Sequence, residues 1–181
     1  MRMSQAEKDK SHARIVSSAS RLLRERGIDG ASVSDVMNDA GMTHGGFYKH
    51  FANKDALVES ALEAAFATFT STLTAGSPDA AAAYRELYLS DKHIRNPGRG
   101  CPVAAIGQDV GRSSTQMKAA FGRGVDEMVD ALAATMPGPA EGRRAAALAQ
   151  FSMLVGAVVI ARASDPRLAR EVVTAVSAAV S

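Results

Sequence analysis

The stretch that decides the fold covers residues 32–57 and reads SVSDVMNDAGMTHGGFYKHFANKDAL. Ser32, followed three residues later by Asp35, is a capping-box arrangement, which predicts that a short helix begins after Ser32. Gly41 ends that helix, and Thr43 can cap another short helix. Two short helices joined by a tight turn containing glycine are the pattern of a helix-turn-helix.

The flanking segments extend this unit on both sides. Residues 1–11 are polar and show no periodicity, so we expect a loose arm there. A helix is predicted from His12 to the arginines that precede Gly27. Asn53 caps a long helix whose apolar positions recur as far as Leu73, and we expect this helix to end at Gly76-Ser77-Pro78.

The remainder of the chain also has helical patterns only. We predict helices at about residues 79–90, 102–110, 115–136, 141–163 and 166–181, with breakers at 96–100 and 137–139. No segment alternates with the period of two that a strand requires. The sequence therefore predicts an all-α protein with a three-helix helix-turn-helix domain at residues 1–55 and a helical domain at residues 56–181.

Composition and charge narrow the class of protein. The chain has 181 residues, of which 46% are hydrophobic and 22% charged, as in ordinary globular proteins. We expect a cytoplasmic protein, because no apolar run reaches the ~20 residues of a membrane span and no signal peptide is evident. Residues 1–54 contain nine Lys/Arg and six Asp/Glu, whereas the rest contains twelve and thirteen, so the basic excess lies at the end that carries the helix-turn-helix.

The second helix of this motif carries groups suited to DNA. A recognition helix presents its N-terminal residues to base edges in the major groove, and here these residues are Thr43, His44, Gly45 and Gly46. Each glycine inside a helix costs on the order of 1 kcal/mol relative to alanine, and a close approach to a large partner would explain that cost. The following residues Tyr48, Lys49 and His50 can donate to phosphates or bases. The alternatives are that Tyr48 is half-buried packing, which its place beside Phe47 argues against, and that His44 and His50 are ordinary surface histidines.

The same stretch resembles the signature of the TetR family of transcriptional repressors. The resemblance covers about residues 12–57 and rests on Ala40-Gly41 at the turn and on Phe47, Tyr48, His50, Phe51, Lys54 and Leu57 after it. The resemblance implies phosphate contacts from Tyr48, His50 and Lys54, with help from Ser32 or Ser34. It implies base contacts from Thr43, His44 and Gly45, and either kind from Lys49. Met37 departs from the family, which more often has a small residue there.

The resemblance also implies a homodimer and a small-molecule effector. Residues 153–161 are apolar or small on all sides, so we expect the last two helices to form the dimer interface, with a monomer core as the alternative. Effector binding would move the long fourth helix and change the distance between the two recognition helices. Candidate residues for the effector pocket, each of which could be plain core instead, are Phe66, Phe69, Tyr84, Tyr88, Cys101, Met117, Phe121, Met128 and Phe151.

Cys101, the single cysteine, precedes Pro102 and is predicted to cap the N-terminus of a helix. A helix N-terminus lowers the pKa of a thiol, so Cys101 is a candidate sensor of electrophiles or oxidants. The Gly100-Cys101 start of this helix is similar to that of some thiol-sensing relatives. The alternative is that Cys101 is an inert, buried, small hydrophobic residue.

Other classes of function are less well supported by the sequence. We find no nucleophile elbow, no phosphate-binding glycine loop and no metal-spaced His/Cys set, and therefore expect neither an enzyme nor a cofactor. We expect a repressor that binds a palindromic operator in double-stranded DNA and is released by a small molecule or by thiol modification. The alternatives are a helical protein-binding adaptor, a non-specific DNA binder or an activator.

Overall fold

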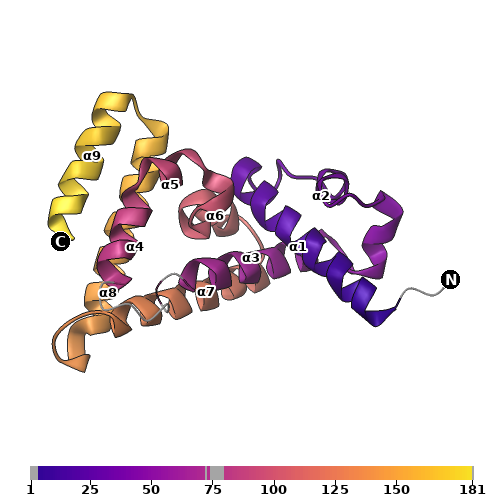
Figure 1. Ribbon diagram of the computed structural model, residues 1–181, viewed down its shortest axis with the longest axis horizontal. Coiled ribbons are helices and arrows are strands. Elements are labelled where there is room, and N and C mark those ends of the chain that lie inside the picture. The colour runs from indigo at the N-terminus through magenta and orange to yellow at the C-terminus, as the bar shows by residue number, and fades with distance from the viewer. Residues whose placement is uncertain (1–3, 72, 74–79, 181) are drawn as a thin grey trace.

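The computed structural model describes residues 4–71, 73 and 80–180, and in these residues all regular structure is helical. The elements are α1 (Gln5–Arg26), α2 (Val33–Asp39), η1 (His44–Lys49), α3 (Lys54–Thr70), α4 (Ala80–Leu89), α5 (Asp91–Arg95), η2 (Pro97–Arg99), α6 (Pro102–Gly111), α7 (Thr115–Ala134), α8 (Ala140–Ala163) and α9 (Pro166–Ala179). The predicted all-α class is therefore confirmed. Figure 1 shows α1 and α2 at one end of the molecule and α9 at the other, with α3 and α7 lying side by side between them.

The predicted loose arm is wrong for residues 5–11, which form the beginning of α1. Ser4 Oγ accepts the Glu7 backbone N–H at 3.2 Å, and the Glu7 carboxylate accepts the Ser4 backbone N–H at 2.8 Å. This reciprocal capping box satisfies donors that a helix start leaves unpaired, so α1 begins seven residues before His12. Residues 1–3 of the predicted arm lie outside the described residues.

The boundaries within the helix-turn-helix agree with the sequence, but the second helix is of another type. Ser32 caps α2 through the predicted capping box with Asp35. The segment after Thr43 forms the 3₁₀ helix η1 rather than an α-helix, and Thr43 makes no side-chain cap hydrogen bond. Asn53 Oδ1 caps α3 by accepting the Ala56 backbone N–H at 2.9 Å, as predicted.

Beyond α3 the main difference is in the segment between α4 and α6. The predicted end of the fourth helix at residues 76–78 lies outside the described residues, as does the predicted start of the next helix at about residue 79. The breaker-rich residues 96–100 contain the 3₁₀ helix η2, and the unpredicted short helix α5 precedes it. Helices α6 to α9 agree with the predicted ranges to within about two residues at their described ends.

One hydrophobic core connects the two ends of the molecule. It includes Ile15 of α1, Leu62 of α3, Leu132 of α7 and Leu154 of α8, all at most 2% exposed. Helices α3 and α7 approach closely at Gly124, where an added Cβ would lie 2.2 Å from the ring of Phe66. The predicted boundary between domains, at residues 55 and 56, falls in the first turn of α3, so this core continues directly from the helix that begins there.

Helix α8 is long and apolar enough to cross a membrane by length and composition alone. Its most apolar window of 18 residues has a mean hydropathy of 1.7, and 33% of that window is buried within the chain. The helix nevertheless contributes Ala147, Phe151, Leu154 and Val158 to the core. Core helices of globular proteins pass the same test, so this helix is weak evidence for a membrane span.

Candidate nucleic-acid interface

Two buried phenylalanines hold η1 on the rest of the N-terminal unit. Phe47 and Phe51 are 2% and 5% exposed, and their rings stack with centroids 5.8 Å apart. Tyr48 lies against Phe47 edge to face, yet its own side chain is 72% exposed. The predicted half-buried alternative for Tyr48 is therefore wrong, because the aromatic pair anchors only one side of the helix.

The turn before η1 is held by a side chain from α1. The Arg14 guanidinium donates to the Ala40 carbonyl at the end of α2. Gly41 follows with φ of +67°, and a Cβ there would lie 2.7 Å from Arg14 Nη2. Both the positive φ and this close contact favour glycine. Met37, the departure from the family pattern, is fully buried, and its methyl group lies beneath Gly46.

The outer side of η1 presents a row of exposed residues. We call Thr43, His44, Gly45, Tyr48 and Lys49 the recognition face, since all five are exposed. His44 Nδ1 lies 3.0 Å from Ser34 Oγ, which joins the start of η1 to α2. A Cβ added at Gly45 would meet nothing within 4 Å, and one at Gly46 would meet only ordinary contacts. Neither packing nor a positive φ within the chain therefore requires glycine at position 45.

The other predicted DNA-contact residues, Ser32 and Lys54, differ from the recognition face in exposure or in the partners of their side chains. Ser32 is exposed, but its hydroxyl is occupied by Asp35, since Oγ accepts the Asp35 N–H at 3.0 Å and lies 2.5 Å from its carboxylate. Lys54 is half-buried at the first position of α3 and has no ion-pair partner among the residues that the structure describes.

His50 lies behind the recognition face rather than on it. Both ring nitrogens are covered and have no hydrogen-bond partner in the described parts of the chain. Burial lowers the pKa of His50, and the nearby His12, Lys8 and Lys49 lower it further. The rings of His12 and His50 have centroids 5.9 Å apart. The N-terminal half of α1 thus adds Lys8 and His12 to this end of the molecule.

Lys8 was not expected near this face, because residues 1–11 were predicted to form an arm. The signal that could have found it is the pair Ser4 and Glu7, which has the spacing of a capping box. A helix beginning at Gln5 necessarily brings Lys8 within one turn of His12.

The candidate effector-pocket residues pack on one another. Phe66 meets Phe121 edge to face at 5.5 Å, and Phe69 meets Tyr84 and Tyr88 at 5.9 and 5.6 Å. The remaining contacts are between Tyr84 and Met128, where the hydroxyl lies 3.7 Å from Sδ, and between Tyr88 and Phe151. Met117 is buried in the same core. These side chains have the contacts of a core, and an effector site among them stays a prediction.

Cys101 occupies the predicted N-cap of α6, but it is completely buried. The predicted lowering of its pKa is wrong, because burial raises the pKa of the thiol more than its hydrogen-bonding neighbours lower it. His93 Nε2 accepts the Cys101 backbone N–H at 2.8 Å, and His93 Nδ1 donates to the Tyr88 carbonyl at 2.5 Å. The Tyr88 hydroxyl lies beside the thiol without a well-aligned hydrogen bond.

Two half-buried arginines complete this group, and we call Arg24, Tyr88, His93, Cys101 and Arg162 the Cys101 cluster. Arg24 of α1 donates to the Gly100 carbonyl at 2.8 Å. Arg162 of α8 donates to the carbonyls of Ile94, His93 and Ala104 at 2.9, 3.0 and 3.3 Å. Neither guanidinium has a carboxylate partner among the residues described, and desolvation lowers the pKa of both. The cluster therefore links α1 with α8 through the segment 93–101.

In the part of the chain that the structure describes, no group of three or more His, Cys, Asp or Glu side chains is placed to hold a metal ion. The exposed functional groups of the N-terminal unit are instead hydrogen-bond donors and basic side chains.

Comparison with known proteins agrees with this arrangement. Residues 15–61 match the family model described as bacterial regulatory proteins, tetR family. The HTH-type transcriptional regulator TtgR of Pseudomonas putida is 33% identical over 63 residues, which are 35% of this chain and 30% of TtgR. The uncharacterized HTH-type transcriptional regulator YvdT of Bacillus subtilis is 36% identical over 52 residues, 29% of this chain and 27% of YvdT. The chain thus matches less than a third of the length of these curated relatives.

Solved structures extend the similarity in fold to nearly the whole chain. The reduced form of E. coli NemR superposes with a TM-score of 0.76 at 20% identity, covering 94% of this chain and 95% of NemR. A TetR-family transcriptional regulator from Cytophaga hutchinsonii gives a TM-score of 0.77 at 17% identity, covering 99% and 96%. Residues 15–61 thus match the tetR family model, and nearly the whole chain shares the fold of TetR-family regulators.

Proposed function

We propose that this protein is a homodimeric transcriptional repressor that binds a palindromic operator in double-stranded DNA. The observation that carries the proposal is the recognition face, where exposed donors and a glycine that the fold does not require lie on a helix anchored by Phe47 and Phe51. A backbone that must approach DNA closely explains the glycine, and Tyr48 and Lys49 supply donors for phosphates or bases.

Behind this face, a group of basic side chains suits the phosphate backbone. Lys8, His12 and Lys49 lie close enough to His50 to lower its pKa, and no carboxylate among the described residues offsets this effect. A phosphate at this position would relieve the repulsion and favour protonation of His50. Lys54, at the N-terminus of α3, would meet a second phosphate with help from the helix dipole.

A dimer follows from the apolar surface of the last two helices. Leu148, Val159 and Ile160 of α8 are 42%, 45% and 44% exposed, although α8 is apolar enough to resemble a membrane span. A second copy packed against α8 and α9 would bury this surface. Two recognition faces on one side of such a dimer would read half-sites about 34–36 Å apart.

The test is selection from a randomised DNA library with the purified full-length chain, followed by measurement of Kd for selected and bulk DNA at two salt concentrations. The repressor proposal expects a palindrome bound at least about 10³-fold more tightly than bulk DNA. Binding without sequence preference would favour the non-specific binder, and no binding would favour the adaptor. Transcription from the selected operator in vitro then separates a repressor from an activator.

We propose further that binding of a small-molecule effector releases the protein from the operator. We also propose that chemical modification of Cys101 releases it, on the basis of one specific observation. The thiol lies near two half-buried guanidinium groups, of Arg24 and Arg162, that have no carboxylate partner in the described residues. In an opened state, the thiol could add across an activated carbon–carbon double bond. The S–C bond would form at one carbon, and the thiol proton would pass to the other.

Cys101 is completely buried, so an adduct there would have to enter the packed interior. It would therefore displace the segment 93–101, which contacts α1 through Arg24. The experiment exposes wild type and Cys101→Ser to an activated alkene, N-ethylmaleimide, and measures adduct mass and operator affinity. Equal loss of affinity in the two proteins would end the thiol proposal and leave operator binding intact.

A further inference from the structure

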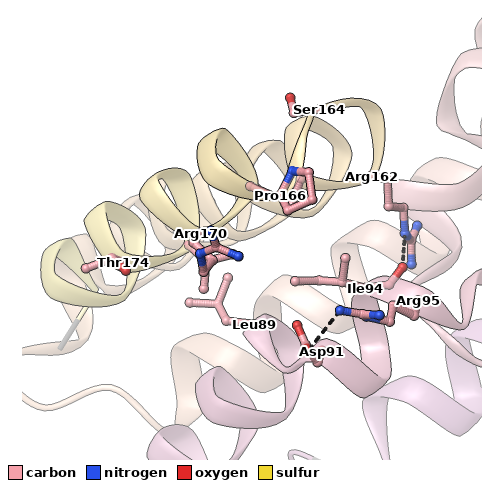
Figure 2. A pocket seen from close by; sticks show the side chains of 12 residues that line it. Leu89, Asp91, Ile94, Arg95, Arg162, Ser164, Pro166, Arg170 and Thr174 are labelled. Atoms are coloured by element: carbon pink, nitrogen blue, oxygen red, sulfur yellow. Dashed lines mark hydrogen bonds and ion pairs between the residues drawn. The ribbon is translucent and has the colours of Figure 1, made fainter.

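A cleft of about 530 Å³ lies between α5, the C-terminal end of α8 and the first half of α9. Its volume is within the range of small-molecule sites. Figure 2 shows Arg170 extending from α9 towards Leu89, with the pair Asp91 and Arg95 on the opposite wall and Arg162 at the side. None of the effector-pocket residues expected from the sequence lines this cleft.

The cleft is strongly cationic. It is lined by three guanidinium groups, from Arg95, Arg162 and Arg170, and by the single carboxylate of Asp91. Arg95 is paired with Asp91 at 3.3 Å, and Arg162 is bound to backbone carbonyls. Arg170 has neither an ion-pair partner nor a hydrogen bond among the residues that the structure describes. Its planar fork of donors is therefore available to a carboxylate, which arginine binds in bidentate geometry.

The rest of the lining is mainly apolar. Leu89, Ile94, Ala161, Ala169 and Val173 supply aliphatic surface, whereas Ser164 and Thr174 add the hydroxyl groups. An inorganic anion would leave this aliphatic surface in contact with water. A carboxylate attached to an apolar skeleton would pair with Arg170 and at the same time cover the aliphatic lining of the cleft.

The cleft and the proposed dimer surface lie on different sides of α9. Arg170, Val173 and Thr174 face the cleft, and these positions are three and four apart. Leu168, Ala175 and Ala179 follow another row of the same helix. A partner chain on that second row would leave the cleft open.

We propose that this cleft is a binding site for an organic carboxylate, with Arg170 as its anion-binding residue. Arg162 lines the cleft and also holds the carbonyls of His93 and Ile94 in the segment that reaches α1. Occupancy therefore acts on the same segment as the Cys101 cluster. Binding in the cleft is independent of the proposed function, whereas release of the operator by the bound carboxylate rests on it.

The experiment measures binding of decanoate to the full-length protein by titration calorimetry, with decanamide as the neutral ligand of matched shape. We expect decanoate to bind and decanamide to bind at least about tenfold more weakly. Arg170→Gln raises the Kd for decanoate about tenfold or more, and Arg170→Lys raises it less. Arg167→Gln, one turn earlier and paired with Glu171 at 2.9 Å, is the matched control and keeps the wild-type Kd.

Absence of decanoate binding, equal binding of decanamide, or an unchanged Kd in Arg170→Gln would each overturn the proposal. Circular dichroism verifies that the Arg170 variants remain folded, which is expected because this side chain is exposed. A separate titration of the selected operator, with and without decanoate, distinguishes the two proposals. Loss of ligand binding with intact operator binding rejects only the cleft, whereas the reverse result rejects only the repressor.

Discussion

The recognition face and the Cys101 cluster use polar side chains in opposite ways. On the recognition face, Tyr48 and Lys49 are exposed, and Gly45 has no neighbour that would exclude a side chain. In the Cys101 cluster, Arg24 and Arg162 are directed inwards and donate to backbone carbonyls far away in the sequence. Residues that the fold does not need indicate an external partner, whereas residues whose donors are satisfied internally hold the two ends of the chain together.

The largest effect on stability is expected from Arg162→Met. This change removes three charge-assisted hydrogen bonds, from the guanidinium to the carbonyls of His93, Ile94 and Ala104, each of which contributes about 1 kcal/mol to stability. We expect a loss of about 3 kcal/mol in the free energy of unfolding, measured by urea denaturation. Arg167→Met, which removes only an exposed ion pair with Glu171, should stay within about 0.5 kcal/mol of wild type. Equal losses in the two variants would show that the cluster does not stabilise the fold.

Two glycines show how the recognition face differs from the packed interior. Gly124→Ala places a Cβ 2.2–2.6 Å from the ring of Phe66, so we expect a loss of about 1–3 kcal/mol from overpacking. Gly45→Ala meets nothing within 4 Å and should leave the free energy of unfolding unchanged or raise it by up to about 1 kcal/mol, because alanine favours a helix over glycine.

Affinity for the selected operator should show the reverse order. Gly45→Ala adds a methyl group where the DNA is proposed to approach, so its Kd for the operator rises, whereas folded Gly124→Ala keeps the wild-type Kd. Thermal melts and a fluorescence anisotropy titration measure the two quantities on the same preparations. If Gly45→Ala binds the operator as wild type does, the glycine does not mark a close approach.

A smaller effect on DNA affinity is expected from Lys49→Met. Removal of one phosphate contact weakens binding to all sequences about equally and reduces the slope of log K against log salt by about one. Lys118→Met removes the same charge from the exposed surface of α7 and serves as the control. A slope that falls equally in both variants would mean that net charge, rather than a contact at η1, determines the salt dependence.

The sequence predicted those parts of the molecule that depend on nearby residues. The capping box at Ser32 and Asp35, the cap at Asn53 and the proline after Cys101 are local signals, and each helix begins where they indicate. The exposure of Tyr48 follows from its place beside two anchoring phenylalanines. The start of α1 was missed although Ser4 and Glu7 carry the same kind of signal.

What could not be predicted depends on contacts between distant residues. The helix N-terminus at Cys101 predicted a lowered pKa, but burial beneath other elements dominates and raises it. The bond from Arg24 to Gly100 spans 76 residues, and that from Arg162 to Ile94 spans 68. The cationic cleft was missed for the same reason, since Arg95, Arg162 and Arg170 come together only when α5, α8 and α9 are packed.

The smallest effect that we expect is a dependence of stability on pH through His93. Desolvation lowers the pKa of His93, despite an opposing contribution from its hydrogen bond to the Tyr88 backbone, and protonation of Nε2 would abolish its acceptor role for the Cys101 N–H. Because the folded pKa lies below the ordinary value of 6.5, the unfolded chain binds the proton first as the pH falls. The stabilisation is therefore complete above pH 6.5 and is lost as the pH falls towards and through the folded pKa.

The measurement is the free energy of unfolding of wild type and His93→Gln at pH 8 and pH 5. His93→Gln is less stable than wild type at pH 8, because the paired ring is gone, but its stability falls less between the two pH values. His50 adds a contribution of the same sign, since burial and the neighbouring cations also lower its pKa. Some pH dependence therefore persists in His93→Gln, and the double variant with His50→Gln should reduce it further. An identical fall in wild type and His93→Gln would mean that the neutral ring of His93 is not what joins Tyr88 to Cys101.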